Sequence, residues 1–533
     1  MKKNQQSDGA KPLVVVAETL ATGGMAELRS AGLEVCDAAG SNQAELAGLL
    51  ANAQALIVRS KTKVTSALLD GAPALRVVGR AGVGVDTIDV EAATRHGIVV
   101  LNTPDSSTLA TAEHTMTLLL ALTRNVVSAN QSVLAGSWDA RNLGGTELAG
   151  KVLGIVGLGR IGAAVAARAR AFQMIVLAHD AVISEARAET LGVKLASLNE
   201  LLERADYISL HVPLTATTRN LIGARELALA KPGVRIVNCA RGGLINEADL
   251  LSALESGHVA GAALDVVSDE PPPQDSDTWS LLRHPKVLAT PHVGGSTREA
   301  QERIALDLCR DVIAVLRGAP PSGAINAPIS APPEVRPFVE LAYRIGRAFP
   351  QVWRDQPLSH FSLTLEGDLG AYESRPFGTA FLNGLLPYLT DRRVSPVNAQ
   401  ELAAELGVRV ESLAAPCERG FSKAINVRCD RRLLAGTVIH GEQLRLVDLD
   451  GFEVDIAPHG HLLLTRHRDI PGIVGKVGTI LGDAHINISN MQVARKDSGN
   501  AIMVLGIDRS PKPAALQSLR AITNVADVEV VEL

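Results

Sequence analysis

Short apolar runs alternate with stretches of helical period over the first part of the chain. The runs LVVVAE, ALIVRS, LRVVGR and GIVVLN predict four strands, and QAELAGLLANA predicts one of the helices between them. Strands that alternate with helices in this way form one parallel sheet built from β-α units. The segment up to about residue 107 is therefore predicted to be a doubly wound α/β domain.

A second series of the same kind begins after Lys151. The strands that it predicts are VLGIVGLG, MIVLAHD, YISLHVP, RIVNCARG, AGAALDVV and VLATPHV. Two long helical patterns connect the series to the first domain, SSTLATAEHTMTLLLALTRNVVSANQSVLAG, predicted as one helix opened by Ser and Thr caps, and GSTREAQERIALDLCRDVIAVLRG. We expect the chain to leave the first domain by one helix and return by the other, which leaves a cleft between two α/β domains.

Beyond these helices the pattern changes. PPSGAINAPISAPPEV is typical of a linker, and Asp450-Gly451 between two alternating runs predicts a hairpin. From His461 to Leu533 the order is strand, helix, two strands, helix and strand, which is typical of a small ferredoxin-like module.

The predicted fold class is α/β, with two doubly wound Rossmann-like parallel-sheet domains, an α+β intervening domain and a C-terminal ferredoxin-like domain. The predicted bounds are 12–107 plus 297–328 for the first domain, 108–296 for the second, 329–459 for the third and 460–533 for the last.

The charge and composition of the chain argue against several classes of function. The formal net charge of −5 and the lack of a basic run with interleaved aromatic residues argue against a nucleic-acid-binding protein. MKKNQQSDGAKP turns polar where a secretory signal needs an apolar stretch, and no run of about 20 apolar residues occurs, so we expect a soluble, cytoplasmic protein with no membrane partner. The cysteines have no zinc-ligand spacing, and we expect reduced thiols and no metal.

The segment KVLGIVGLGRIG carries the clearest cofactor motif. Gly157, Gly159 and Gly162 follow a strand and open a helix, where they allow a tight turn, close approach to a pyrophosphate and close helix packing. Asp180 ends the next strand, where a carboxylate binds the adenosine ribose and repels a 2′-phosphate. The cofactor predicted is therefore NAD.

Three chemically distinct side chains follow successive strands of the second domain. In doubly wound sheets ligands bind beyond the carboxyl ends of the strands, and Arg241, Glu270 and His292 all follow such ends. They suit oxidation of a 2-hydroxy acid, with the arginine on the carboxylate, the histidine as base and the glutamate orienting the imidazole. Taken alone, Arg241 is as well explained by a surface ion pair with Glu247, and a lone histidine is more often a core residue.

GLGRIG, CARGG, ALDV with DEPPP, and PHVGGST together resemble the D-isomer-specific 2-hydroxyacid dehydrogenases. The similarity continues through IVRSKTKVT, RAGVGVDTID and NTPDSS, and then through the C-terminal part, which resembles the long form of the family with an intervening domain and an ACT domain. One departure is Gln173, which stands where the family usually has glycine. The resemblance implies NAD-dependent oxidation of D-3-phosphoglycerate to 3-phosphohydroxypyruvate in serine biosynthesis.

The resemblance also implies roles for individual residues. The catalytic set would be Arg241, Glu270 and His292. Substrate binding would involve Arg59, Arg80, Asn102 and, in a loop lent to a dimer partner, Arg141. The cofactor contacts would be Gly157, Gly159, Arg160, Ile161, Gly162, Asp180, Val212, Cys239, Ala240, Asp265, Gly294 and Gly295.

The ACT-like module suggests an effector. Its resemblance implies that L-serine binds at His467, Asp469 and Asn487, between paired modules of a homodimer or homotetramer. The competing interpretation is that Asp469 caps a helix while the other two are surface polar residues. Two other functions stay open, a reductase of another 2-oxo acid such as 2-oxoglutarate, hydroxypyruvate or glyoxylate, and a non-catalytic NAD(H) or amino-acid sensor.

Overall fold

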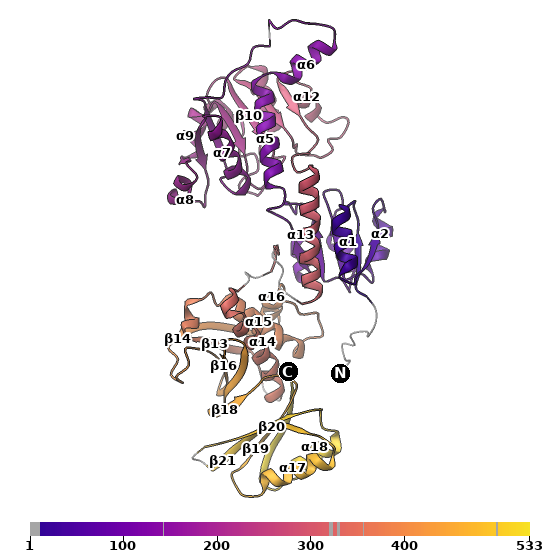
Figure 1. The fold of residues 1–533 in the computed structure, drawn as a ribbon, viewed down its shortest axis with the longest axis vertical. Helices are drawn as coiled ribbons and strands as arrows, with labels where there is room; N and C mark the ends of the chain where they lie inside the picture. Colours follow the sequence, from indigo (N-terminus) through magenta and orange to yellow (C-terminus); the bar gives the residue numbers. More distant parts are fainter. Residues whose placement is uncertain (1–10, 142, 319–322, 328–330, 355–356, 497–498) are drawn as a thin grey trace. The chain divides into compact units, whose positions relative to one another are not determined.

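The computed structural model describes residues 11–141, 143–318, 323–327, 331–354, 357–496 and 499–533 (Figure 1). The chain divides into two compact units, one from residues up to 63, 78–87 and 101–323, and the other from 64–77, 88–100 and 324–533. The mixed α/β character and the parallel sheets expected from the sequence are confirmed. None of the described helices is long and apolar enough to cross a bilayer.

The N-terminal sheet has five strands in the order β2-β1-β3-β4-β5. They are β1 (Leu13–Val16), β2 (Glu34–Asp37), β3 (Ala55–Val58), β4 (Val77–Arg80) and β5 (Val99–Leu101). Its helices are α1 (Thr22–Ser30), α2 (Gln43–Leu50), α3 (Ser66–Asp70) and α4 (Val90–Arg95). The four predicted strands are present, whereas β2 was missed because its sequence, EVCD, has a charge at each end.

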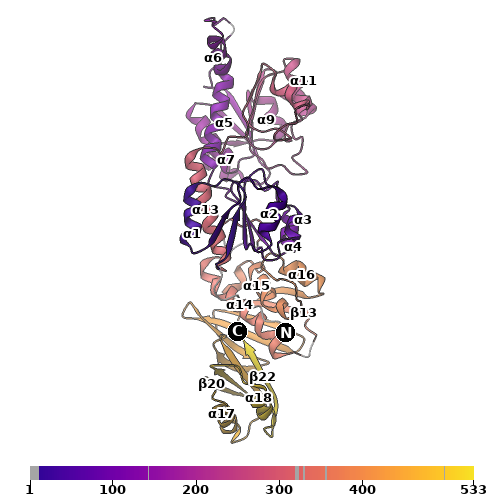
Figure 2. The same cartoon turned by 90° about the vertical axis from the view of Figure 1, so that its right-hand side faces the viewer.

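The returning helix α13 (Arg298–Leu316) lies beside α1 (Figure 2). Glycine permits this approach, because a Cβ on Gly24 would lie 2.8 Å from the Cβ of Ala305. The predicted return of the chain by this long helix is therefore present in the structure.

The second sheet has seven strands in the order β12-β11-β10-β9-β6-β7-β8, all parallel. They are β6 (Val152–Val156), β7 (Ile175–His179), β8 (Lys194–Leu195), β9 (Tyr207–Leu210), β10 (Val234–Asn238), β11 (Val259–Leu264) and β12 (Val287–Ala289). One apolar cluster joins the sheet to α5 (Thr108–Thr123) and α7 (Arg160–Ala171). A second cluster joins it to α9 (Leu198–Arg204), α10 (Ala224–Leu229), α11 (Glu247–Glu255) and α12 (Thr278–Leu282). Between β7 and β8 lies α8 (Glu185–Thr190).

The single helix predicted over 106–136 is wrong. The segment forms α5 and then α6 (Val126–Leu134), separated at Asn125, whose φ of 54° is incompatible with a continuous α-helix. Its side chain donates to the carbonyl of Gly144 (3.0 Å), which stabilises the break. The hydrophobic period runs through the break, so periodicity alone did not reveal it.

The intervening segment is an α+β structure around one core. Its sheet has the order β14-β13-β15-β16-β17-β18, from β13 (His360–Gly367), β14 (Arg409–Ala415), β15 (Lys423–Cys429), β16 (Arg432–Ile439), β17 (Gln443–Leu449) and β18 (Phe452–Ile456). The helices are α14 (Arg336–Val352), α15 (Arg375–Leu385) and α16 (Ala399–Glu405). The predicted hairpin is confirmed, with Asp450 and Gly451 at positive φ between β17 and β18. Residues 320–322 and 328–330 of the predicted linker lie outside the described residues.

The C-terminal module has the predicted β-α-β-β-α-β order. It consists of β19 (His461–Arg468), α17 (Ile473–Asp483), β20 (Ile488–Arg495), β21 (Asn500–Ile507), α18 (Pro513–Arg520) and β22 (Val525–Glu532). Alternate residues of β19 face opposite sides, because Leu463 belongs to the core under α17 and α18 whereas Leu462 and Leu464 join the core of the intervening segment. The module is thus buried on both faces of its sheet.

A charged cluster lies where these two cores meet. The guanidinium of Arg466 lies 3.2 Å from carboxylate oxygens of both Asp527 and Glu529, and 3.7 Å from Asp450. Burial raises the pKa of Glu529 to about 7, and the nearby Arg466 opposes this while Asp527 adds to it. One cation therefore pairs with three acids, and burial favours the protonated form of Glu529.

We expect Glu529→Gln to raise the melting temperature at pH 8 by several degrees. Glu529 ionises near 4.5 when unfolded and near 7 when folded, so the wild-type protein loses stability as the pH rises through that window. The gain should vanish as the pH falls toward 4.5. Exposed Glu411→Gln is the control in thermal unfolding at both pH values, and an equal melting temperature for wild type and Glu529→Gln at pH 8 contradicts the assignment.

Candidate active site

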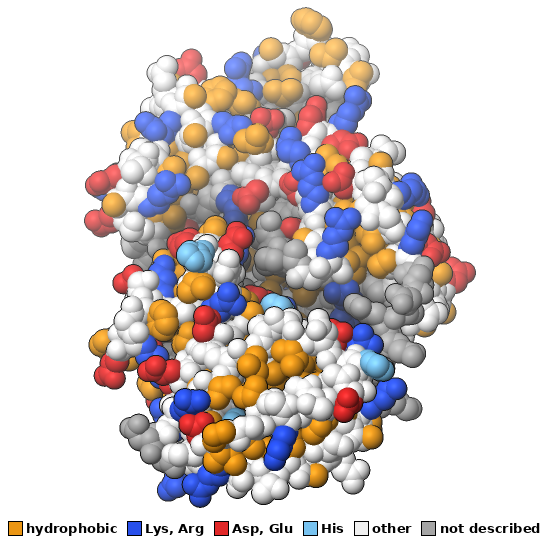
Figure 3. Space-filling model, turned by 60° about the horizontal axis from the view of Figure 1, so that its bottom comes forward, with side chains coloured by type: hydrophobic (Ala, Val, Ile, Leu, Met, Phe, Trp, Pro, Cys, Tyr) orange, Lys and Arg blue, Asp and Glu red, His pale blue; other side chains and the backbone are white. Residues whose placement is uncertain are grey.

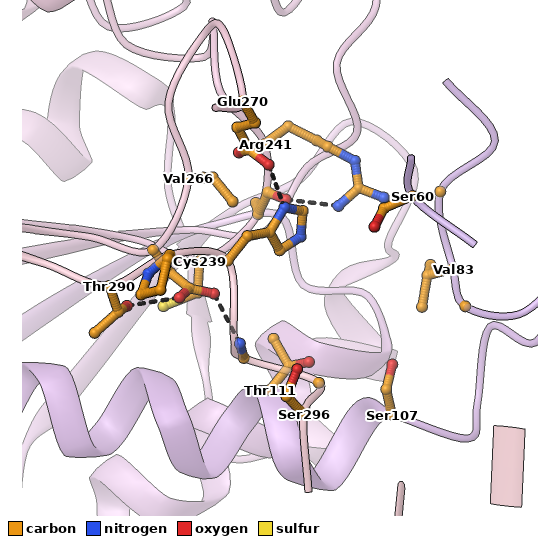
Figure 4. Close-up of a pocket in the computed structure, with 18 of the residues that line it drawn as sticks. Ser60, Val83, Ser107, Thr111, Cys239, Arg241, Val266, Glu270, Thr290 and Ser296 are labelled. Carbon is orange, nitrogen blue, oxygen red and sulfur yellow. Dashed lines mark hydrogen bonds and ion pairs between the residues drawn. The ribbon is translucent and has the colours of Figure 1, made fainter. Parts of the chain in front are cut away.

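A cavity of about 1190 Å³ lies in the first unit, at the carboxyl ends of the strands of the seven-stranded sheet. Arg241, Glu270 and His292 all line it, and Figure 4 shows Arg241 and Glu270 facing the same space. The structure therefore brings the three predicted catalytic residues together from separate segments of the chain.

The glycine-rich turn after β6 forms one end of the site. Gly157 has φ +96°, and a Cβ on it would lie 2.6 Å from the carbonyl oxygen of His211. A Cβ on Gly162 would lie 2.1 Å from the carbonyl oxygen of Gly157, whereas one on Gly159 would meet nothing within 4 Å. Gly157 and Gly162 are thus required by the fold, and Gly159 leaves open space above the N-terminus of α7 for a phosphate. Arg160 and Ile161 line the cavity.

Asp180 holds the turn that precedes this space. Its Oδ2 accepts from the amide of Leu158 (2.7 Å), and Oδ1 accepts from the amides of Val182 (2.8 Å) and Ile183 (3.0 Å). Burial alone would raise the pKa of Asp180, but these amides outweigh burial and lower it. One lone pair of Oδ2 stays available for a ribose hydroxyl, so the residue fits the predicted cofactor.

Arg241 is anchored at the end of β10 by its own turn. The side chain of Asn238 donates to the carbonyl of Arg241 (2.9 Å) and accepts from the amide of Ala240 (3.0 Å). The guanidinium donates to the carboxylate of Asp86 from Nε (3.1 Å) and to the carbonyl of Ala240 from Nη1 (2.6 Å). The alternative pairing with Glu247 does not occur, because Glu247 accepts from the amide of Ser268 and the hydroxyl of Thr278.

Glu270 and His292 form a close pair in the cavity. Nδ1 of His292 lies 2.5 Å from Oε2 of Glu270 (Figure 4). The other oxygen of Glu270 accepts from the amide of Val267 (3.2 Å). A carboxylate beside Nδ1 holds the hydrogen there, which leaves the lone pair on Nε2. The imidazole is therefore set to accept a proton at Nε2.

Asp265, at the end of β11, supports the histidine loop. Burial alone would raise the pKa of Asp265, but hydrogen bonds from His114, Thr290, Val293 and Gly294 outweigh burial and lower it to about 2. Its side chain is only 1% exposed, and Gly294 packs directly against it. The neighbouring thiol of Cys239 stays neutral, because burial raises its pKa to about 12.

Cationic side chains line the opposite wall. Arg59 donates from Nη2 to the side chain of Gln301 (2.7 Å), whereas Nε of Arg80 is buried with no partner among the described residues. Burial lowers the pKa of Arg80 to about 10, and repulsion from Arg241 adds to the effect. Asn102 supports this wall by donating to the carbonyl of Val83 (2.6 Å) and does not line the cavity.

Other predicted residues lie at the edge of the cavity or away from it. Val212, Cys239, Ala240, Gly294 and Gly295 line the cavity. Arg141 does not, and its exposed side chain pairs with Asp139 (2.7 Å).

The three predicted effector residues belong to the C-terminal module. The His467 side chain is buried and its Nδ1 lies 3.3 Å from the hydroxyl of Thr465, whereas Asn487 is exposed. Asp469 pairs with Arg495 (3.1 Å) and makes no cap hydrogen bond to α17. His467 pairs with Ala501 at one end of β21, whereas Ile488, next to Asn487, pairs with Ile507 at the other end, so His467 and Asn487 lie at opposite ends of the sheet within one chain.

Comparison with known proteins matches three family models to successive parts of the chain. They are the NAD binding domain of the D-isomer specific 2-hydroxyacid dehydrogenases over residues 116–294, the D-3-phosphoglycerate dehydrogenase intervening domain over 334–450 and the ACT domain over 461–524. The D-3-phosphoglycerate dehydrogenase of Bacillus subtilis (strain 168) is 42% identical over 489 residues, 90% of this chain and 92% of the relative. The Methanocaldococcus jannaschii protein of the same name is 40% identical, over 94% and 96% of the two chains.

The chain belongs to the D-3-phosphoglycerate dehydrogenase family. It is an NAD-dependent D-2-hydroxyacid dehydrogenase with a Rossmann-like NAD-binding domain and an ACT domain. A crystal structure of a Thermus thermophilus protein is similar over 59% of this chain and 99% of its own, with 38% identity and a TM-score of 0.55. The D-lactate dehydrogenase of Aquifex aeolicus, crystallised with NAD and lactic acid, is similar over 57% and 96% of the chains, with 29% identity and a TM-score of 0.52.

Several residues that hold the site together were not found from the sequence. They are Asp86, His114, Asn238 and Thr290, each of which acts on a predicted residue through a hydrogen bond. Only Asn238 gave a usable signal, because it directly precedes CARGG at the end of a buried strand. The other three lie 25 or more residues from the partners they contact.

Two glycine substitutions should separate folding from NAD binding. We expect Gly159→Ala to keep the wild-type melting temperature while weakening NADH binding about tenfold or more, because its methyl group enters only the open space. Gly162→Ala should lower the melting temperature, because its methyl group meets the backbone at 2.1 Å. Thermal unfolding measures the melting temperatures, and fluorescence titration measures NADH binding. Wild-type affinity for NADH in Gly159→Ala contradicts the placement of the phosphate above Gly159.

Proposed function

We propose that the chain oxidises D-3-phosphoglycerate to 3-phosphohydroxypyruvate with NAD, the first step of phosphorylated L-serine biosynthesis, in the cytoplasm. The observation that carries the proposal is the placement of a His292–Glu270 pair, Arg241 and a cationic wall around one cavity. The relatives that carry the name D-3-phosphoglycerate dehydrogenase support the substrate, because they match this chain over most of its length.

The residues divide the chemistry between them. Arg241 binds the substrate carboxylate through Nη2. Its Nε donates a second hydrogen bond to the carboxylate once its bond to Asp86 is broken, and the two bonds fix C2 beside the imidazole. Nε2 of His292 accepts the proton of the C2 hydroxyl, and Glu270 stabilises the imidazolium that forms. Bound NAD supplies the hydride acceptor.

The cationic wall favours a phosphorylated acid. Arg80 has a buried Nε without a partner among the described residues, and Lys61 and Lys63 line the same cavity. A buried donor without a partner is costly, and a phosphate oxygen would satisfy it. Because its pKa is about 10, Arg80 stays charged at the pH of the cell.

A second candidate within the class is reduction of another 2-oxo acid. The Paecilomyes thermophila glyoxylate reductase is similar over 59% of this chain with 32% identity, and its name says that it acts on an acid without phosphate. The sensor hypothesis has less support, because the residues needed for turnover all face the cavity.

We expect Arg80→Gln to raise KM for D-3-phosphoglycerate about tenfold to a hundredfold, the effect of losing one charge-assisted bond. KM for D-glycerate, which has no phosphate, should change less than about twofold. NADH absorbance at alkaline pH, with product removed, measures both, and Arg204→Gln in the exposed pair with Glu200 is the control. Wild-type enzyme that prefers glyoxylate or 2-oxoglutarate over the phosphorylated pair contradicts the proposed substrate.

We further propose a homodimer or homotetramer with L-serine as effector. Helix α6 has no buried residue, and Val133, Leu134 and the nearby Trp138 are exposed, as expected for a surface covered by a second subunit. Figure 3 shows hydrophobic side chains gathered on the C-terminal module, where Val474 and Met491 are exposed. Pairing of two such modules would bring Asn487 of one subunit toward the module of a second subunit, where both could contact one ligand.

Millimolar serine should inhibit the full-length enzyme, and Asn487→Ala should weaken that inhibition at least fivefold. Coupling between such sites is typically about 1–3 kcal/mol, which corresponds to roughly 5- to 150-fold. Activity without serine should stay within about twofold, and exposed Lys512→Ala is the control. Indifference of wild type to serine rules out this effector, and light scattering tests the assembly separately.

A further inference from the structure

A histidine behind the cavity contacts the group that holds the catalytic loop. His114 lies in the middle of α5 with its side chain 18% exposed, and it is not among the residues that line the cavity. Its Nε2 lies 3.2 Å from Oδ1 of Asp265 and 3.1 Å from the hydroxyl of Thr290. His114 therefore lies outside the cavity, and its hydrogen bonds connect it to the site through these two partners.

The hydrogen-bond pattern determines where the proton of His114 lies. The hydroxyl of Thr290 donates to Oδ1 of Asp265 (2.6 Å), so the oxygen of Thr290 presents only lone pairs to the imidazole. The carboxylate of Asp265 is ionised and also only accepts. Because both neighbours of Nε2 are acceptors, Nε2 of His114 carries a hydrogen, shared between them.

Asp265 connects His114 to the turn that carries His292. Its Oδ1 accepts from the amide of Val293 (2.9 Å), its Oδ2 accepts from the amide of Gly294 (2.9 Å), and its carbonyl accepts from the amide of His292 (2.8 Å). His292 has φ of 51°, a left-handed conformation that a non-glycine residue adopts only when its surroundings enforce it. These bonds, all to Asp265, hold the turn in that conformation and so fix the imidazole beside Glu270.

We propose that His114 is a positioning residue that, through Thr290 and Asp265, holds the turn bearing the catalytic base His292. The inference deepens the proposed function and rests on it, because the role of His292 as base belongs to that proposal. The imidazole N–H adds a third donor to Oδ1 of Asp265, so the carboxylate cannot rotate away from the amides of Val293 and Gly294. Loss of that donor should loosen the base, while the substrate-binding arginines stay in place.

Two substitutions at the same position test whether the donor matters. A glutamine side chain places its amide nitrogen near the position of histidine Nε2, whereas the asparagine amide reaches only as far as Nδ1. We therefore expect His114→Asn to lower kcat about tenfold with KM for D-3-phosphoglycerate within about twofold, the pattern of a defect in the chemical step. His114→Gln should restore kcat to within about threefold of wild type.

The matched control is His96→Asn. His96 forms an exposed His–Asp pair with Asp70 (2.8 Å), and neither residue lines the cavity. Its replacement should leave kcat, KM and the melting temperature unchanged. NADH titration by fluorescence gives a readout besides turnover, and the dissociation constant should rise less than about threefold in His114→Asn, because the glycine-rich turn is untouched.

The outcomes separate the hypotheses. Unchanged kcat in His114→Asn overturns the inference, and so does an equal loss of kcat in the asparagine and glutamine variants, which would show a packing role only. If His114→Asn fails to fold, Thr290→Val replaces it in the test. We expect the same tenfold loss of kcat at unchanged KM, and a wild-type kcat in Thr290→Val overturns the inference. If wild type does not oxidise D-3-phosphoglycerate, the proposed function fails first, and the same variants are then compared on the 2-hydroxy acid that wild type does oxidise.

Discussion

The buried carboxylate of Asp265 is the group on which the geometry of the site depends. An ionised carboxylate that is almost fully buried is stable only when its lone pairs are filled by donors, and here they come from α5, from Thr290 and from two backbone amides of one loop. The requirement acts in both directions. The donors keep the carboxylate ionised, and the carboxylate keeps the loop in a conformation that places His292 against Glu270.

The dependence on long-range hydrogen bonds explains which residues of the site could be predicted from the sequence and which could not. The convergence of Arg241, Glu270 and His292 on one cavity was predictable because the carboxyl ends of parallel strands lie along one edge of a sheet, so residues after neighbouring strands lie close together. Asp86 and His114 follow no such rule. Asp86 lies 155 positions from Arg241, and it meets Arg241 through a loop of the N-terminal sheet whose path no local pattern encodes. His114 lies inside a helix whose apolar period conceals it, and only its contact with Asp265 reveals its role.

For the fold, too, the sequence predicted the elements that follow a general pattern and missed those that depend on one local feature. Strands with apolar runs and the β-α-β-β-α-β module were predicted because burial on one or both faces leaves a period in the sequence. The break at Asn125 and the strand β2 were not predicted, because the first depends on one backbone dihedral and the second on pairing with β1 rather than on its own residues. Gln173 is informative here, since it adopts φ of 61° at the place where the family usually has glycine. The backbone requirement persists although the residue that normally meets it is absent.

The cationic wall shows that the site is arranged for its ligand and not for the stability of the empty protein. Burial lowers the pKa of Arg80 to about 10, and repulsion from the nearby Arg241 adds to the effect. The charges of Asp86 and Glu18 favour the charged form of Arg80, but Asp86 forms its ion pair with Arg241, and Nε of Arg80 has no partner among the described residues. Two repelling guanidinium groups held in a cavity store electrostatic energy that an anion with two charged ends releases on binding. A carboxylate alone would neutralise only one of them, whereas a phosphorylated acid presents an anionic group to each.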